Sequence, residues 1–263
     1  PQISTPLSPQ SAAAQPPSPP PIAPFPLDRA TAVGDVRFGG DASSPPASTA
    51  ASAAAASGLG PSPTLPSLES WSNFGSVRAR AAVRAGRWAF EVVLGSAGIA
   101  QVGWATARAA ARFTNEEGVG DAPDSYAFDG RRVRKWAGES APYGEAWAPG
   151  DTITCCLDVA ARSVSFYRNG RALGVAFAGI RTAPRSGGPP ASPGPLDYHP
   201  AVSLSYGERV EVSLGGAAPL CAAALAAGFQ PIEAPPVGRE AAAWLVGCLA
   251  RLAEVGCGGK GEA

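Results

Sequence analysis

The sequence predicts an all-β fold: a two-sheet antiparallel β-sandwich, with a disordered N-terminal leader before it and a short C-terminal helix after it. From Trp71 onward, short segments of alternating apolar and polar residues are separated by Gly, Asn-Gly and Asp-Gly, a pattern typical of strands joined by tight turns. No segment before Gly238 has the sustained apolar period of a long helix. Many short strands at regular spacing favour a sandwich.

We divide the chain into a leader over residues 1–67, the β-sandwich over 68–231, and a helical tail over 232–263 that starts a following region. The leader is rich in Pro, Ala and Ser and poor in aromatic and β-branched residues, so it cannot bury enough apolar surface to offset the entropy of ordering. One exception is Thr31 to Phe38, which could add an edge strand to the sandwich. Because the chain begins with Pro1 and contains no Met, we expect it to be an internal piece of a longer protein.

The first strands are predicted at Phe74 to Ala82 and in the segment RWAFEVVL. Alternation along that segment places Glu91 on one face and four apolar side chains on the other: Trp88, Phe90, Val92 and Leu94. In the next segment, IAQVGWAT, Val102 and Trp104 share a face. We assign five large aromatic side chains to the buried core: Trp88, Phe90, Trp104, Trp147 and Phe166.

Two hairpins are predicted from their turn residues. In the first, Tyr126 to Trp136, Asp129-Gly130 supplies the positive φ angles that a two-residue primed turn requires. In the second, Ser163 to Phe177, Asn169-Gly170 has the same role. Three further segments alternate as strands: Asp151 to Asp158, Val202 to Ser205, and Val210 to Leu214.

Two segments stand outside this pattern. The stretch from Arg181 to Asp197 is rich in Pro, Gly and Ser, and we predict a long surface loop there. Arg239 to Val255 is predicted to form an amphipathic helix, because five apolar residues recur at helical spacing: Trp244, Leu245, Cys248, Leu249 and Leu252. This apolar stripe could begin the next domain of a longer protein or pack on the edge of the sandwich.

The charge pattern excludes several classes of partner. Lys and Arg number 21 and Asp and Glu number 21, with no basic block, so neither nucleic acid nor an anionic membrane is an expected partner. No apolar run is long enough to cross a bilayer, and the leader lacks the features of a signal peptide. We therefore expect a soluble, cytoplasmic protein.

The cysteines do not have the spacing of a metal site, and His199 is the only histidine in the chain. Cys155 and Cys156 are adjacent in a predicted strand, so their side chains point to opposite faces and cannot easily bridge each other. We expect the cysteines to act as small buried hydrophobes in a reducing compartment.

The chain also lacks the motifs of enzyme chemistry. It contains neither a G-x-S-x-G nucleophile elbow nor a P-loop. Asp121, Asp124 and Asp129 cluster in sequence as calcium or glycosidase carboxylates might require, but further oxygen ligands are missing and roles in turns are favoured. We expect no catalytic residue, cofactor, metal or small-molecule substrate in this chain.

Six blocks, in this order, resemble the SPRY domain: GRWAFEVVL, GIAQVGWAT, GVGDAPDSYAFDGRRVRKW, WAPGDTIT, FYRNGRALGVAF and PAVSLSYGERVEVSLG. The likeness covers about Leu68 to Pro231. It is closest to the SPRY module of the large RING-finger E3 ubiquitin ligases of the complex that ubiquitinates a cyclin-dependent-kinase inhibitor, particularly their plant members. The Pro-rich stretch from Arg181 to Asp197 is longer than the connection in that family.

The resemblance implies a non-catalytic protein-protein interaction module that binds a protein substrate or partner subunit for ubiquitin-dependent degradation. A RING finger with its zinc ions would lie outside this chain, which has no Cys/His array. These residues alone are therefore not expected to be a ligase, although the full-length protein would be a RING-type ubiquitin transferase. The alternatives are a SPRY adaptor or scaffold domain of a non-ligase protein, or a sugar-binding or enzymatic sandwich.

We place the partner-binding site on and beside the first hairpin, because aromatic and Arg side chains on the loops of a rigid sandwich make good recognition surfaces. The candidates are Tyr126, Asp129, Arg131, Arg132, Trp136 and Tyr143. For Tyr126 and Trp136 a place in the core is favoured over a partner contact, because the aromatic side chains of a small sandwich are usually needed inside. Arg131 and Arg132 are expected on an exposed turn, where charge reversal should weaken binding and leave the fold intact.

Overall fold

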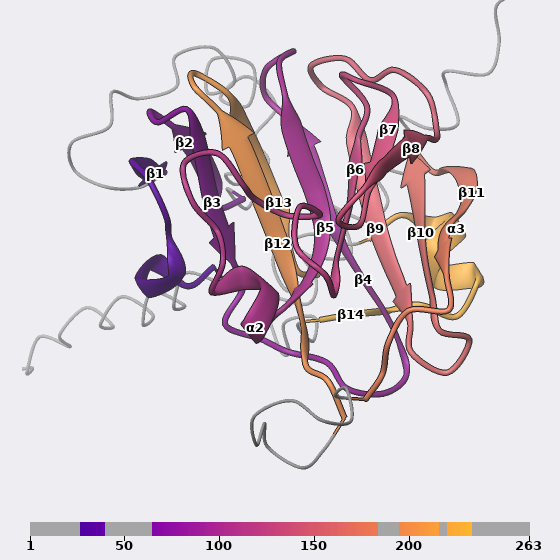
Figure 1. Cartoon of the computed structure of the whole chain (residues 1–263). Coiled ribbons are helices and arrows are strands. Elements are labelled where there is room, and N and C mark those ends of the chain that lie inside the picture. Colours follow the sequence, from indigo (N-terminus) through magenta and orange to yellow (C-terminus); the bar gives the residue numbers. More distant parts are fainter. Residues whose placement is uncertain (1–26, 40–64, 184–194, 216–219, 233–263) are drawn as a thin grey trace, which may run out of the picture.

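The computed structural model describes residues 27–39, 65–183, 195–215 and 220–232, which form two β-sheets packed face to face (Figure 1). The predicted β-sandwich is confirmed. The predicted helix from Arg239 to Val255 and most of the predicted loop from Arg181 to Asp197 lie outside the described residues.

Within the described residues, the larger sheet has eight strands in the order β1-β2-β13-β4-β9-β10-β11, with β14 also paired to β4. All its pairs are antiparallel except that of β14 with β4. Its strands are β1 (Val36–Phe38), β2 (Ser67–Ser70), β4 (Arg87–Leu94), β9 (Thr152–Asp158), β10 (Ser163–Arg168), β11 (Arg171–Ala178), β13 (Arg209–Ser213) and β14 (Gln230–Pro231).

The second sheet, counted over the same residues, has six strands in the order β3-β12-β5-β6-β7-β8, all antiparallel. Its strands are β3 (Phe74–Arg78), β5 (Ala100–Thr106), β6 (Ser125–Asp129), β7 (Arg134–Trp136), β8 (Ser140–Pro142) and β12 (Tyr198–Ser205). The prediction of a first strand from Phe74 to Ala82 was wrong in its place and length, since β1 and β2 precede β3 and β3 ends at Arg78.

The core lies between the two sheets, where alternate residues of every central strand meet. Phe90, Trp104 and Phe166 are completely buried there, and Trp147 is 8% exposed. Trp88 packs against this core, as predicted, but it is only half-buried. It stands near the start of β4, where its indole N–H donates a hydrogen bond to the Ala85 carbonyl oxygen.

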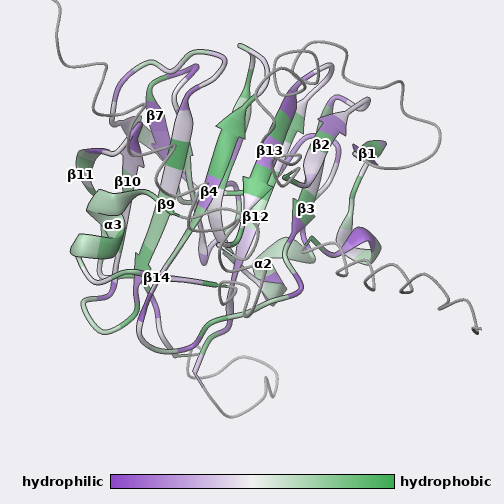
Figure 2. Cartoon of the chain, turned by 180° about the vertical axis from the view of Figure 1, so that it is seen from behind, coloured by the Kyte–Doolittle hydropathy of each residue, from purple (hydrophilic) through white to green (hydrophobic). Residues whose placement is uncertain are grey.

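The outer faces of both sheets are partly covered as well. Helix α2 (Ala107–Ala110) and the loop after it cover the six-stranded sheet, where Phe113 and Val119 are buried. Helix α3 (Ala222–Ala226) covers β4 and β9 of the other sheet, and Figure 2 shows it from outside as a hydrophobic element beside β9 and β10. Because of these two covering segments, some outward-facing side chains of the strands are buried in small secondary cores.

The cover by α3 explains two features of the larger sheet. Cys155 faces the main core and Cys156 packs under α3, so the prediction that they point to opposite faces is confirmed. Glu91, on the outward face of β4, is 1% exposed, and its carboxylate accepts hydrogen bonds from Thr154 Oγ1 at 3.0 Å and from the Cys221 backbone N–H at 2.7 Å.

The segment from Thr31 to Phe38 adds an edge strand, as predicted, because β1 pairs with β2 at the end of the larger sheet. The residues before β1 run along β3 of the other sheet, with bridges from Leu27 to Ala79 and from Val33 to Ser76. Residues 27–39 therefore belong to the sandwich and cover an edge that would otherwise be open to pairing.

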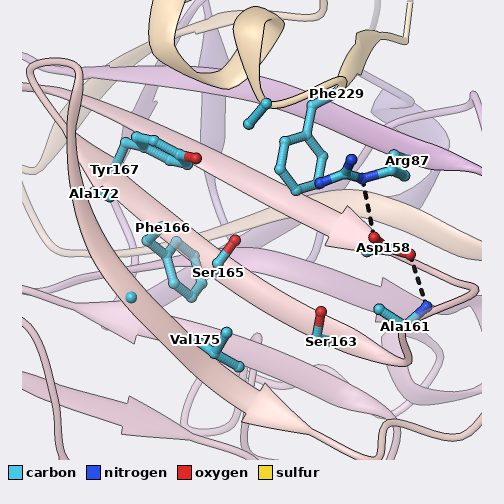
Figure 3. A pocket seen from close by; sticks show the side chains of 12 residues that line it. Arg87, Asp158, Ala161, Ser163, Ser165, Phe166, Tyr167, Ala172, Val175 and Phe229 are labelled. Carbon is cyan, nitrogen blue, oxygen red and sulfur yellow. Dashed lines mark hydrogen bonds and ion pairs between the residues drawn. The ribbon is translucent and has the colours of Figure 1, made fainter.

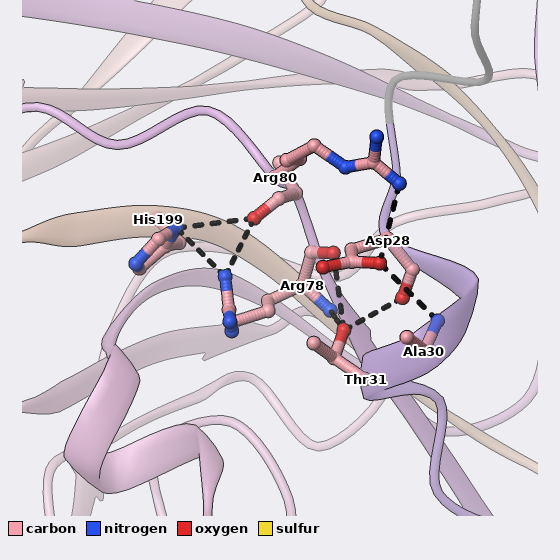
Figure 4. A network of polar contacts seen from close by, with 7 residues as sticks. Asp28, Ala30, Thr31, Arg78, Arg80 and His199 are labelled. Carbon is pink, nitrogen blue, oxygen red and sulfur yellow. Dashed lines mark hydrogen bonds and ion pairs between the residues drawn. The ribbon is translucent and has the colours of Figure 1, made fainter.

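A network of polar contacts holds this N-terminal segment (Figure 4). Asp28 accepts a hydrogen bond from the Ala30 backbone N–H at 3.2 Å within the short helix η1 (Arg29–Thr31) and lies 3.6 Å from Arg80. Thr31 Oγ1 donates to the Asp28 carbonyl oxygen at 2.7 Å and lies 3.4 Å from the Arg78 backbone N–H. The network ties the segment to β3.

His199 lies at the inner end of the same network. It is 6% exposed, and its Nδ1 is 3.0 Å from the carbonyl oxygens of both Ala79 and Ala81 and 3.1 Å from Arg78 Nη1. Burial, together with the positive charge of Arg78, lowers the pKa of His199 below its ordinary value. These contacts give the side chain a structural role between β12 and the chain after β3.

The two predicted hairpins both form, but only one has the predicted turn. In the β10–β11 hairpin, Asn169 and Gly170 have φ angles of 49° and 78°, as a primed turn requires. The β6–β7 hairpin has a longer loop, because Asp129 pairs with Arg134. The prediction of a two-residue turn at Asp129-Gly130 was therefore wrong: in this loop the left-handed residue is Val133, with φ 53°.

Candidate functional site

An open groove of about 290 Å³ lies on the outer face of the six-stranded sheet, where α2 and the loop after it leave the strands uncovered. We call it the arginine groove, after its central residue. It is lined by Asn73, Phe74, Ile99, Gln101, Glu116, Asp121, Arg132, Trp136 and Ser205. The lining combines apolar side chains with groups that can exchange hydrogen bonds, which is the usual character of a recognition site.

Arg132 is held in place from three sides. The carbon at the centre of its guanidinium group lies 4.3 Å from the centre of the Trp136 ring. Its Nε donates to the carboxylate of Asp129, and its Nη2 lies 3.1 Å from the side-chain oxygen of Gln101 in the amide orientation that satisfies both groups. The side chain is still 34% exposed. An arginine fixed in this way loses little conformational freedom on binding a partner.

Asp129 organises the loop beneath Arg132. Its side chain is completely buried, and Oδ1 accepts hydrogen bonds from the backbone N–H groups of Arg131 at 2.8 Å and Arg132 at 3.1 Å. Because the carboxylate replaces the backbone hydrogen bond of a tight turn, the loop can be four residues long and still rigid.

The floor of the arginine groove is a second polar layer. Gln101 is 1% exposed and, in the same amide orientation, donates to the Val119 carbonyl oxygen at 3.0 Å. Asp121 Oδ2 accepts a hydrogen bond from the Gly118 backbone N–H at 2.8 Å. Burial raises the pKa of Asp121, although this hydrogen bond, Gln101 and the charge of Arg132 oppose the rise.

Two exposed aromatic side chains stand beyond one end of the groove. Trp71 is 39% exposed and Tyr206 is 63% exposed, and their rings meet edge to face with centres 5.7 Å apart. Tyr206 directly follows the groove residue Ser205, and Trp71 is two residues before Asn73. We call Trp71 and Tyr206 the aromatic pair.

Backbone contacts fix the aromatic pair. The Trp71 N–H donates to the Asp35 carbonyl oxygen at 2.7 Å, and the Gly207 N–H donates to that of Ser70 at 2.8 Å. The guanidinium carbon of Arg37 lies 4.3 Å from the centre of the Trp71 ring. Exposed, rigid aromatic rings of this kind are characteristic of protein-binding hot spots.

The six predicted site residues do not form one surface. Arg132 and Trp136 line the arginine groove, Arg131 is exposed on the loop, and Asp129 lies buried below it. Since neighbouring strand residues alternate between faces, Tyr126 and Phe128 point to the opposite side of the sheet from Ala127.

Tyr126 and Tyr143 both pack on that inner side. The ring centre of Tyr126 is 5.2 Å from that of Phe177, and the ring centre of Tyr143 is 5.4 Å from that of Phe128. The Tyr143 hydroxyl donates to the Gly174 carbonyl oxygen at 2.7 Å, and burial raises the pKa of this hydroxyl. Both tyrosines join the two sheets rather than line the groove.

The structure also changes the expected result of reversing both arginine charges. Arg131 is exposed, but Arg132 neutralises a completely buried carboxylate. A glutamate at position 132 would face Asp129 across the same short distance and would destabilise the loop. Only the substitution of Arg131 is expected to leave the free energy of unfolding nearly unchanged.

Asn73, Phe74 and the aromatic pair were not among the site residues predicted from the sequence. The available signal was the turn Tyr206-Gly207 between two strands, since a large aromatic in a tight turn has no strand face to bury it. Trp71 could not be identified in the same way. It lies between β2 and β3, and its exposure depends on how distant parts of the chain pack around these strands.

These features define a rigid antiparallel β-sandwich with a preformed groove on the outer face of one sheet. Residues 87–217 match the family model of the SPRY domain, so this chain carries a SPRY domain. Over 185 residues it is 48% identical to the E3 ubiquitin-protein ligase RKP of Arabidopsis thaliana, a match that covers 70% of this chain and 13% of that protein.

Two further relatives are RNA helicases. The chain is 35% identical over 101 residues to the ATP-dependent RNA helicase Ddx1 of Drosophila melanogaster, covering 38% of this chain and 13% of the helicase. It is 32% identical over 111 residues to DDX1 of Xenopus laevis, covering 42% and 14%. The chain thus spans only about an eighth of the length of these relatives.

The described residues contain no cluster of three or more His, Cys, Asp and Glu side chains that could hold a metal ion. No helix among them is long and apolar enough to cross a membrane.

Proposed function

We propose that this chain is the protein-recognition domain of a RING-type E3 ubiquitin ligase and that the arginine groove, with the aromatic pair, captures a segment of a protein substrate or partner subunit. The similarity to the ligase supports the first part, because it extends over 70% of the chain at 48% identity, whereas the helicase matches are shorter and weaker. The observation that carries the second part is the fixed, partly exposed Arg132 between Trp136 and Gln101.

The chemistry of the groove suggests how a peptide would bind. The free side of the Arg132 guanidinium can donate charge-assisted hydrogen bonds to a carboxylate or to main-chain carbonyl oxygens. Phe74 and Ile99 offer apolar contact next to it, and the aromatic pair offers a large rigid surface beyond. An extended segment with an acceptor group at one end and an apolar or aromatic residue several positions away would use the whole site.

In this proposal the chain binds and does not catalyse. Ubiquitin transfer would be supplied by a RING finger, with its zinc ions, elsewhere in the longer protein. We place this work in the cytoplasm, because Cys155, Cys156 and Cys221 are free thiols, as expected in a reducing compartment.

The test compares capture by the wild-type chain with capture by a variant of the aromatic pair, Trp71→Ala with Tyr206→Ala. Proteins that the wild-type chain retains from plant extract are identified by mass spectrometry, and the strongest is purified and titrated against both chains. We expect at least a tenfold loss of affinity, since exposed aromatic hot spots typically contribute more than 1 kcal/mol each. Equal affinity of the double variant would show that the site lies elsewhere.

The matched control is Val175→Ala, which removes an equally exposed apolar side chain from the other sheet. It should leave the affinity unchanged. A ubiquitination assay with the full-length protein then tests the ligase half of the proposal: a captured protein that the full-length protein never modifies would contradict it and leave the groove itself intact.

A second candidate function is supported by the helicase relatives: the same groove in an adaptor or scaffold domain of a protein that is not a ligase. The adjoining coding sequence separates the two. A C-terminal array of cysteines and histidines with RING spacing supports the ligase, and a complete gene without one supports the adaptor.

A further inference from the structure

The arginine groove carries more negative than positive charge. Arg132 is the one cation among the described residues that line it, and the completely buried carboxylate of Asp129 already balances its charge. Glu116 and Asp121 also line the groove, and Glu117 is exposed next to Glu116. None of these three carboxylates forms an ion pair with another residue that the structure describes. The groove therefore has an excess of negative charge.

The loop that carries the two glutamates is held in place by its own hydrogen bonds. Thr114 Oγ1 accepts hydrogen bonds from the backbone N–H groups of Glu116 at 3.1 Å and Glu117 at 3.0 Å. The side-chain amide of Asn73, which also lines the groove, donates to the Asn115 carbonyl oxygen at 3.3 Å. Because the backbone of the loop is anchored, the carboxylates are presented from a fixed position before any partner arrives.

The charges in and beside the groove act on one another. Burial raises the pKa of Asp121, the charge of Glu117 adds to the rise, and the charge of Arg132 opposes it. A cationic side chain of a ligand would relieve the repulsion between the carboxylates, whereas an anionic side chain would add to it. The groove therefore favours a positively charged side chain over a negatively charged one.

A second groove shows that this excess of charge is particular to one face of the sandwich. It has a volume of about 360 Å³ and lies on the outer face of the larger sheet, between α3 and β11 (Figure 3). We call it the apolar groove. Arg87 and Asp158 are the only charged side chains among the described residues that line it, and they form an ion pair at 2.9 Å. The charges in the apolar groove therefore cancel.

We propose that the arginine groove selects a basic segment of its partner, in which a lysine or arginine side chain pairs with Glu116 and Asp121 and a main-chain carbonyl oxygen accepts a hydrogen bond from Arg132. This inference rests on the proposed function and deepens it, because it names the class of segment that the groove takes. A carboxylate is a poorer partner for Arg132 than a carbonyl oxygen, since it would meet the repulsion of the neighbouring carboxylates. Glu116 is exposed, so its pairing with the ligand gives specificity and speed of association more than affinity.

The first test selects random peptides, displayed on phage, for binding to the full chain. Peptides that bind the wild-type chain but not the variant Trp71→Ala with Tyr206→Ala use the site. In these peptides we expect Lys and Arg to be enriched over the starting library and Asp and Glu to be depleted. Enrichment of Asp and Glu, or no charge preference, would overturn the inference and leave the proposed function standing. If no peptide distinguishes the two chains, the proposed function fails together with the inference.

The second test titrates one selected basic peptide against charge variants of the chain. Glu116→Lys should lower the affinity on the order of tenfold, because it places a like charge beside the cation of the peptide. The matched control is Glu211→Lys, which makes the same change in net charge at an exposed position on the outer face of the larger sheet. The control should change the affinity less than twofold. Equal losses in the two variants would show a general attraction between the peptide and the chain and would overturn the inference.

The third test exchanges the two charges. The peptide residue whose replacement by alanine costs the most affinity is identified among its Lys and Arg residues and is then changed to glutamate. This peptide should bind the Glu116→Lys chain several-fold more tightly than it binds the wild-type chain, since opposite charges meet again. A peptide that still prefers the wild-type chain would contradict the inference. Near-UV circular dichroism checks that each variant keeps the folded sandwich.

Discussion

The two grooves lie on opposite sheets of one sandwich, and they differ in how their walls are held. In the arginine groove a buried carboxylate, an amide and an aromatic ring fix one exposed charge, Arg132. The apolar groove lies on the outer face of the larger sheet, between α3 and β11. Its floor side chains, such as Ser163 and Ser165, are small, its sides include Val175 and Phe229, and Arg87 and Asp158 form an ion pair at one end. The first is prepared for a partner with polar groups, and the second for an apolar surface.

The difference follows from what covers each sheet. The arginine groove lies beside the loop after α2, and the other groove lies beside the end of α3, but the outward strand residues under them are not alike. Gln101 on β5 demands hydrogen-bond partners, because a buried amide without them is costly, and so it organises Arg132. Ser163 and Ser165 on β10 are small enough to leave room for another side chain. One sandwich thereby supports two independent surfaces.

The largest effect is expected from a substitution in the core, which supports both grooves. Trp104→Ala should lower the free energy of unfolding by about 3–5 kcal/mol, because the side chain is completely buried and its loss leaves a cavity. Trp88→Ala should cost clearly less, since Trp88 is only half-buried. Urea denaturation measures both. Equal costs would mean that Trp88 is buried in solution.

Asp129→Ala should separate the two grooves. It leaves two backbone N–H groups and Arg132 without their acceptor, so we expect a loss of about 2–3 kcal/mol in unfolding free energy. Partner affinity at the arginine groove should fall. Asp129→Asn, which keeps one acceptor oxygen for the loop, should recover much of the stability. No recovery would indicate that charge, and not the hydrogen bonds of the loop, is decisive.

Arg132→Ala tests partner binding at the arginine groove with a smaller effect on the fold than Asp129→Ala. We expect partner affinity to fall at least tenfold, about 1.4 kcal/mol, because the fixed guanidinium is lost from the centre of the groove. Arg131→Ala, one residue away and exposed, should change it less than twofold. Isothermal titration with the identified partner distinguishes them. Similar losses from both variants would point to general electrostatic attraction instead of a specific groove.

The smallest expected effect concerns pH and touches neither groove. Burial lowers the pKa of His199 in the fold, so the unfolded chain binds a proton more readily, and stability falls as the pH drops through about 6.5 and below. His199→Gln should reduce this fall when denaturation is compared between pH 7.5 and pH 5.5. A steeper decline in the variant would contradict the sign of the shift.

Several parts of this protein follow from local sequence alone. Alternation identified β4, β9 and the inward positions of Phe90 and Trp104, since side chains of a strand point to opposite faces in turn. Asn169-Gly170 specified its turn because few residues adopt positive φ at low cost. Arg132 and Trp136 could also be placed on a hairpin from the sequence, because they lie in a recognisable hairpin block, and both line the arginine groove.

Other parts were decided only when distant segments met. Glu91 is buried because Cys221, 130 residues later, brings α3 across β4. Tyr126 and Tyr143 face the second sheet, and Trp71 and Tyr206 remain exposed, for reasons that no local pattern contains. Period and turn chemistry are local properties of a chain, so the sequence by itself determined the sandwich. The covering of an outer face depends on long-range packing, so only the tertiary structure decided where the two grooves lie.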